Sequence, residues 1–213
     1  GFITSEGQKM SKSLGNVVDP LEYVEKYGVD PLRWYLLREI PTTDDGDFSD
    51  GRFIEVYNSE LANGLGNLVN RVVMMTEKYS EGKVPAVVDC EVSGDLEKLV
   101  GDYKGYFEGF DLKKACETLN AVIDLGNKYI DDKKPWAMAK EGAEGLEGVL
   151  YHMVEILRYI AVLLQPILPG TAGKMAGQLG LDVEDFSLDL QWGGIKEGTA
   201  VSKADVLFAR LEE

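Results

Sequence analysis

Histidine and cysteine, which often carry metal-binding or nucleophilic chemistry, are scarce in this chain of 213 residues. It has one histidine, His152, and two cysteines, Cys90 and Cys116, which lie far apart and form no Cys-x-x-Cys pair. This scarcity argues against a disulfide framework or a zinc site and fits free thiols in a reducing cytosol. His152 lies in the apolar string VLYHMVEILR, so we expect a structural role for it.

Long apolar runs are also missing. The most apolar string, YIAVLLQPILPG, is too short to span a bilayer and is interrupted by Gln165 and Pro166. The chain opens with GFITSEGQ, which lacks both an initiator Met and the layout of a signal peptide. We therefore expect a cytoplasmic protein with no membrane segment, cut internally so that something preceded Gly1.

Basic residues are in deficit, with 22 Lys and Arg against 37 Asp and Glu and a net charge of -15. That balance argues against a general binder of polyanions, because phosphate contacts require Lys and Arg. The charge is unevenly distributed: residues 1–40 carry five basic and six acidic side chains, and residues 111–140 carry six and five. These two stretches are therefore expected to repel an anion least.

Helical patterns dominate the rest of the sequence. A short hairpin is expected in residues 1–10, and Asp19-Pro20 and Asp30-Pro31 each place a capping acceptor before a proline suited to a first helical turn. Gly28 would close the first of these short helices. The acidic string PTTDDGDFSD is expected to be a loop.

Ser49 can cap a long helix that runs to about Tyr79. Further helices are expected at about 94–108, 111–132, 135–140 and 145–165, so the chain from residue 51 onward has the pattern of a helical bundle. The last 35 residues or so predict a loop-rich return that ends in a docking segment. The predicted fold class is mainly all-α.

A small cationic loop, QKMSKSLGN, occupies residues 8–16. Lys9 and Lys12 on a glycine-flanked turn can reach phosphate oxygens, because Lys is a mobile point charge. By composition alone, such a loop is usually a solvated surface turn. The whole string KMSKS, followed by GN and DP, resembles the second signature of class I aminoacyl-tRNA synthetases.

That resemblance implies a loop of Lys9, Met10, Ser11, Lys12 and Ser13 that closes over ATP. Lys12 would stabilise the negative charge that develops as the amino-acid carboxylate attacks the α-phosphate and pyrophosphate leaves. Lys9 would assist, which makes Lys9 and Lys12 the expected catalytic residues. ATP with Mg is the implied cofactor of the full-length enzyme, whereas no bound cofactor and no metal ligand are expected in this chain alone.

Four separated strings narrow the resemblance to methionyl-tRNA synthetases: YGVDPLRWYLLREIPTTDDGDFS, NSELANGLGNLVNRV, NKYIDDKKPWAMAK and LFARLEE. Together they cover nearly the whole chain. The implied fold is a helical bundle of the class I synthetase anticodon-binding type, preceded by a short remnant of the catalytic domain. The expected parts are a remnant with the lysine loop at 1–48, an anticodon-binding domain at 49–178 and a return and docking segment at 179–213.

Asparagine is frequent in the expected long helix, although it is a poor residue for a helix interior. Asn63, Asn67, Asn70 and Arg71 have a helical spacing that places them on one face, where amide and guanidinium groups can bind base edges. Asn58 and Asn63 could equally tie helices together in the core. The family resemblance implies that Asn67 and Arg71 bond bases of a CAU anticodon.

Trp136 follows Pro135 at an expected bend among several lysines. An indole placed there can stack on an unpaired base, although composition alone favours a core or rim anchor. We assign that packing role to Trp34 and Trp192. For Trp136, the resemblance implies stacking on the first anticodon base.

The resemblance implies a methionyl-tRNA synthetase, which ligates methionine to tRNA(Met) using ATP. Class I synthetases also need a first signature of the form His-Ile-Gly-His, which a chain with a single histidine lacks. This chain alone should therefore not aminoacylate tRNA, and its expected partners are tRNA(Met), through the anticodon, and a missing N-terminal catalytic domain. Two alternatives stay open: another class I synthetase of the valyl, leucyl or cysteinyl type, and a helical protein-interaction module without RNA binding.

Overall fold

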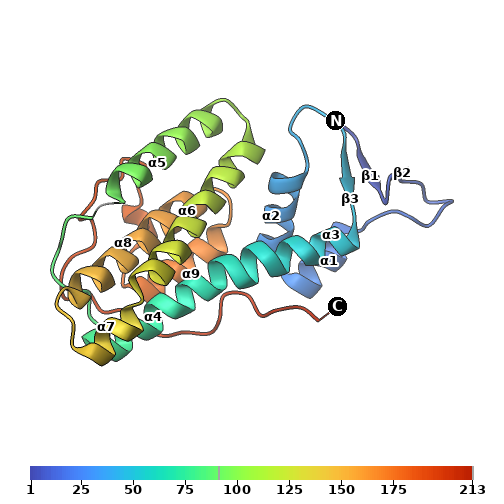
Figure 1. Cartoon of the computed structure of the whole chain (residues 1–213). Helices are drawn as coiled ribbons and strands as arrows, with labels where there is room; N and C mark the ends of the chain where they lie inside the picture. Colours follow the sequence, from blue (N-terminus) through green and yellow to red (C-terminus); the bar gives the residue numbers. More distant parts are fainter. Residues whose placement is uncertain (91, 213) are drawn as a thin grey trace.

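The computed structural model describes residues 1–90 and 92–212 and confirms a mainly α-helical fold. Figure 1 shows a helical bundle at one end of a long helix and a small sheet near its other end. The helices are α1 (Pro20–Tyr27), α2 (Val29–Glu39), α3 (Asp50–Val56), α4 (Asn67–Ser80), α5 (Ser93–Glu108), α6 (Leu112–Lys133), α7 (Pro135–Glu141), α8 (Leu146–Leu164) and α9 (Pro169–Leu179). No helix of the described residues is long and apolar enough to cross a membrane.

The sheet contains the expected hairpin and one strand that was not expected. Its strand order is β2-β1-β3, and its strands are β1 (Ile3–Ser5), β2 (Gln8–Lys9) and β3 (Gly46–Phe48). β1 pairs antiparallel with β2 and parallel with β3, with Ser5 opposite Phe48. β3 lies in the string predicted to be a loop. β3 forms because it pairs with β1, which is distant in sequence, and the turn-forming residues around β3 do not predict such a long-range pairing.

The long helix begins at Ser49, as predicted, and the side chain of Ser49 accepts a hydrogen bond from the backbone N–H of Arg52. The helix is continuous from α3 through a π-helical segment, η1 (Tyr57–Gly66), into α4. The π-helical segment was not predicted, because its apolar residues still recur at intervals close to the α-helical period.

α2 begins at Val29, two residues before the Pro31 start that the capping pattern suggested, and Asp30 does not cap its own helix. Its carboxylate instead accepts hydrogen bonds from the backbone N–H and the hydroxyl of Thr171, at 2.5 and 2.7 Å, in the first turn of α9. Negative charge is favourable at a helix N-terminus, so this bond both caps α9 and fixes α2 to the bundle.

α9 was not predicted, because its sequence contains three glycines and glycine disfavours helices. Its stability comes from packing, since Ala172, Met175 and Leu179 are fully buried. α8 forms the centre of the core and is buried along nearly its whole length, as its broad apolar pattern predicted.

The end of the chain runs back along the long helix. The ring of Phe208 packs edge-on against Tyr57, with centroids 5.9 Å apart. The amide of Asn58 bonds both the N–H and the C=O of Leu211. This last segment therefore covers the π-helical part of the long helix, close to the sheet end of the molecule (Figure 1).

Candidate nucleic-acid interface

The lysine loop, residues 8–16, begins with the short strand β2 and then folds back on itself. Asn16 closes it from inside: its side-chain oxygen accepts from the N–H of Ser11 at 2.8 Å, and its amide donates to the C=O of Lys9 at 3.2 Å. The hydroxyls of Ser11 and Ser13 lie 2.7 Å apart. Lys9 and Lys12 are exposed, whereas Met10 and Ser11 are partly buried. The serines and Asn16 thus shape a turn that presents two ammonium groups to solvent.

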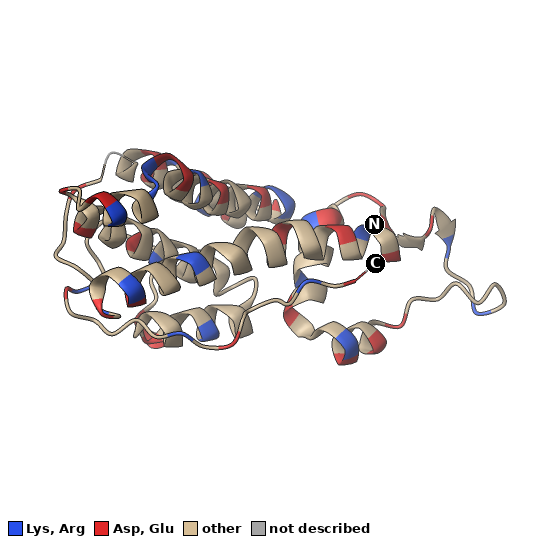
Figure 2. Ribbon diagram, turned by 60° about the horizontal axis from the view of Figure 1, so that its bottom comes forward, with Lys and Arg blue, Asp and Glu red and all other residues tan. Residues whose placement is uncertain are grey.

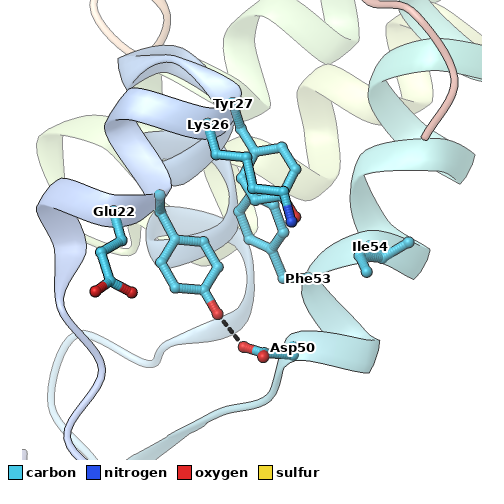
Figure 3. Close-up of a pocket in the computed structure, with 7 residues that line it drawn as sticks. Glu22, Lys26, Tyr27, Asp50, Phe53 and Ile54 are labelled. Carbon is cyan, nitrogen blue, oxygen red and sulfur yellow. Dashed lines mark hydrogen bonds between the residues drawn. The ribbon is translucent and has the colours of Figure 1, made fainter. Parts of the chain in front are cut away.

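The hairpin that carries this loop is attached to the start of the long helix. Glu6 accepts a hydrogen bond from the N–H of Asp50 at 3.2 Å, and its own N–H donates to Phe48. On the other side, the hydroxyl of Tyr23 in α1 donates to the carboxylate of Asp50 (Figure 3). The ring of Tyr23 also packs edge-on against Phe53, with centroids 5.1 Å apart. The hairpin before the loop and helix α1 after it are therefore both attached to α3.

The four asparagines of the long helix have different environments. Asn58 is buried and bonds Leu211, so it is a structural residue. Asn63, for which a core position was equally open, is exposed, and so is Asn67. Asn70 is partly buried and borders a cleft against the C-terminal residues 203–207. Asn67, rather than Asn70, is thus the amide available to a ligand beside Arg71.

Arg71 lies between an acidic and an aromatic side chain. One of its terminal nitrogens lies 2.6 Å from a carboxylate oxygen of Asp131, near the end of α6. Its guanidinium carbon lies 5.8 Å from the ring centroid of Trp136, at the start of α7, within the range of a cation–π contact. Three helices, α4, α6 and α7, therefore bring one charge, one counter-charge and one indole together.

Trp136 is the exposed tryptophan of the three, with 44% of its surface accessible. Trp34 is 1% exposed and donates its ring N–H to Glu60 at 2.8 Å. Trp192 packs against the rings of Tyr151, His152 and Tyr159 and donates to the C=O of Val88. The packing roles predicted for Trp34 and Trp192 are therefore confirmed, whereas Trp136 is exposed and has the guanidinium of Arg71 over its ring.

Charge around this site is mixed. In the view of Figure 2, basic and acidic positions are scattered along the helices, and no continuous run of basic positions is visible. Lys134 and Lys140 are exposed beside Trp136, while Asp131 and Asp132 are exposed just before them. Such a surface gives little general attraction for phosphate, so a nucleic acid would have to be held through its bases.

The one histidine and both cysteines of the chain, His152, Cys90 and Cys116, are buried. Residues 1–90 and 92–212 contain no group of three or more His, Cys, Asp and Glu side chains that could hold a metal ion. Burial raises the pKa of the Cys116 thiol to about 12, which keeps it protonated. His152 is buried, and its Nδ1 lies 2.6 Å from the hydroxyl of Tyr129. The structural role predicted for His152 fits this position.

Asp131 is the residue of this site that sequence reasoning missed. It is one of several acids near the end of a helix, and its sequence neighbours give no sign that it pairs with Arg71, 60 residues away. The sequence shows the positive charge of Arg71, but it does not show which acidic side chain pairs with it. Only the packing of α4 beside α6 reveals the pair.

Comparison with known proteins identifies the family of this chain. Residues 1–73 match the family model described as tRNA synthetases class I (M), and residues 80–213 match the model described as anticodon binding domain of methionyl tRNA ligase. The whole chain aligns with the methionine–tRNA ligases of Synechocystis at 39% identity and of Bacillus subtilis at 43% identity. It spans 43% and 33% of the lengths of these two relatives.

A solved structure of Mycobacterium tuberculosis methionyl-tRNA synthetase in complex with methionyl-adenylate has the same fold. The TM-score is 0.89 at 34% sequence identity, and the match covers 99% of this chain and 43% of the other. The valyl, leucyl and cysteinyl alternatives lose their support, because both the anticodon-domain model and the relatives are of the methionyl type. The chain belongs to the methionyl-tRNA synthetase family.

Proposed function

We propose that this chain recognises the CAU anticodon of tRNA(Met), as part of a methionyl-tRNA synthetase that ligates methionine to that tRNA using ATP. The observation that carries the proposal is the position of the Arg71 guanidinium over the exposed indole of Trp136. A splayed-out nucleotide is bound in proteins by stacking on an aromatic ring and by hydrogen bonds to its edges. The site offers both on adjacent helices.

In this proposal the three side chains have separate tasks. The indole of Trp136 stacks on the first anticodon base. Arg71, whose planar guanidinium has several N–H donors, and Asn67, whose amide both donates and accepts, bond base edges. Asp131 holds the guanidinium in a fixed direction before RNA arrives, so little rotamer freedom is lost on binding.

The lysine loop serves a different step. We propose that Lys12 stabilises negative charge on the α-phosphate during adenylate formation, assisted by Lys9, with Met10, Ser11 and Ser13 shaping the ATP-binding loop. Both ammonium groups are exposed and can approach a phosphate. Mg would arrive with ATP. The reaction also requires a nucleotide-binding domain whose His-Ile-Gly-His signature is not among these 213 residues.

The proposed organisation follows from these two tasks. Residues 1–48 belong with the catalytic part, residues 49–178 form the anticodon-binding domain, and residues 179–213 return and dock. The partners are tRNA(Met) and the remainder of a class I catalytic domain, in the cytoplasm. This chain alone is inactive in aminoacylation, because it holds the lysine loop without the rest of the active site.

Binding of an anticodon stem-loop tests the proposal. The chain should bind a CAU stem-loop more tightly than a GAU variant, by about 1–3 kcal/mol for one wrong base. Affinity should fall only modestly with salt, because the site makes few phosphate contacts. Equal affinity for both stem-loops would refute anticodon recognition, and no binding to either would favour the alternative of a protein-interaction module.

A further inference from the structure

The corner between α6 and α7 is made by a single residue, Lys134. α6 ends at Lys133 and α7 begins at Pro135. The N–H of Lys134 donates to the C=O of Ile130 at 2.9 Å and completes α6. Its C=O accepts from the N–H of Ala137 at 2.8 Å and begins α7. One residue therefore belongs to the hydrogen-bond ladders of both helices.

The backbone of Lys134 has an uncommon conformation. Its φ of 50° and ψ of 57° lie in the left-handed region, which residues with a Cβ rarely enter. Glycine supplies this conformation at the next corner, where Gly142 follows α7 with a φ of 63°. Residue 134 is a lysine, so its backbone keeps the strain of the left-handed conformation. Buried Pro135, with its fixed φ and no N–H, prevents α6 from continuing as a straight helix.

This corner sets the distance between the two halves of the candidate site. Asp131, which holds Arg71, lies in the last turn of α6, whereas Trp136 is the second residue of α7. The chain changes direction between these two residues at Lys134. A different φ there would rotate α7 and move the indole away from the guanidinium, which now lies 5.8 Å from its ring.

We propose that Lys134 is a positioning residue for RNA binding, acting through its left-handed backbone and not through its charge. It fixes the corner so that indole and guanidinium are presented together before the RNA arrives. The proposal rests on the proposed function of Arg71 and Trp136 as anticodon contacts. It goes beyond that function because Lys134 itself needs no contact with a base.

Two substitutions by uncharged residues separate the effect of the backbone conformation of Lys134 from the effect of its charge. Lys134→Asn and Lys134→Val both remove the ammonium group, but Asn tolerates the left-handed region and β-branched Val does not. The 213-residue chain is used throughout, with the CAU stem-loop as the RNA. Lys134→Asn should stay within about twofold of the parent affinity. Lys134→Val should bind roughly tenfold more weakly, because its corner relaxes in the free chain and must regain the left-handed conformation on binding, and a cost of 1.4 kcal/mol corresponds to a factor of ten.

A second readout does not depend on RNA. The indole N–H resonance of Trp136, identified by its loss in Trp136→Phe, should stay in place in Lys134→Asn and shift or broaden in Lys134→Val, while the melting temperatures of the two variants agree. This readout separates the two proposals: if the parent chain fails to bind the stem-loop, the proposed function fails and the resonance still tests the corner.

Three results would overturn the inference. Equal losses of affinity in both variants would assign the role to the charge of Lys134. Equal retention in both would show that the conformation of residue 134 is immaterial. A weaker Lys134→Val that melts at a lower temperature, with the Trp136 resonance unmoved, would make Lys134 a structural residue only.

Discussion

The side-chain amide of Asn58 bonds both backbone groups of Leu211, accepting from its N–H at 2.9 Å and donating to its C=O at 3.1 Å. Asn58→Ala leaves these two partly buried backbone groups without their partner. We expect a loss of about 1–3 kcal/mol in the free energy of unfolding, measured by urea denaturation. The matched control is Asn63→Ala on the same helix, which is exposed and should change stability by less than about 0.5 kcal/mol. Equal effects of the two variants would show that the bond to Leu211 contributes nothing.

Arg71→Lys tests whether the guanidinium reads bases or merely supplies charge. Lysine keeps the positive charge but lacks the planar array of donors and stacks poorly on an indole. The preference for CAU over GAU stem-loops should shrink by about 1–3 kcal/mol, as measured from the two dissociation constants. Retained preference in Arg71→Lys would reduce Arg71 to an electrostatic contact.

Glu39 should support stability at neutral pH and lose that effect in acid. Burial favours its neutral form, but hydrogen bonds from Arg52 and the charges of Arg52 and Arg38 outweigh burial and lower the pKa of the carboxyl group. A carboxyl group whose pKa is lowered in the folded state stabilises the folded protein at pH values above its unfolded-state pKa of about 4.3. This stabilisation is lost as the pH falls through the folded-state pKa. Unfolding free energies of Glu39→Gln should therefore fall less steeply with acid than those of the parent.

Glu55→Gln is the control for that series. Glu55 pairs with the same Arg52, at 2.9 Å, but its side chain is 65% exposed, and exposed pairs contribute little. Its unfolding curve between neutral and acidic pH should follow that of the parent chain. If Glu39→Gln also follows the parent, the partly buried pair of Glu39 with Arg52 has no part in acid unfolding.

Lys12→Ala tests the catalytic role of the lysine loop in an enzyme that contains the complete catalytic domain. The rate of adenylate formation, followed by pyrophosphate exchange, should fall by about 10²-fold or more, because a positioned charge at the reacting phosphate is lost. Stem-loop affinity should stay constant. Lys26→Ala is a nearby control, since Lys26 lies in α1 with its ammonium over the ring of Tyr27. A normal exchange rate in Lys12→Ala would contradict the assignment.

Sequence patterns predicted the elements whose cause is local. The cap at Ser49, the corner before Trp136 and the apolar residues of α8 are each readable within one or two turns of helix. Trp136 is instructive, because composition alone favoured a packing role, whereas the structure leaves 44% of its surface accessible.

Features with a distant cause were missed. Asp30 has the pattern of a cap for its own helix, but its partner is Thr171. β3 exists only because β1 lies beside it, and α9 is a poor helix sequence stabilised by burial. Asp131 gains its role from Arg71 across 60 residues. In each case the deciding contact is tertiary, and local propensity gives no sign of it.

Stacking of the first anticodon base on Trp136 can be tested by a double-mutant cycle. The dissociation constants of the parent chain and of Trp136→Ala are measured for the CAU stem-loop and for the same stem-loop with an abasic first anticodon position. We expect the abasic change to cost the parent about 1–3 kcal/mol of binding free energy and to cost Trp136→Ala almost nothing, because the stacking partner is already gone. If the two costs simply add, the indole and the base do not touch, and Trp136 does not stack on the first anticodon base.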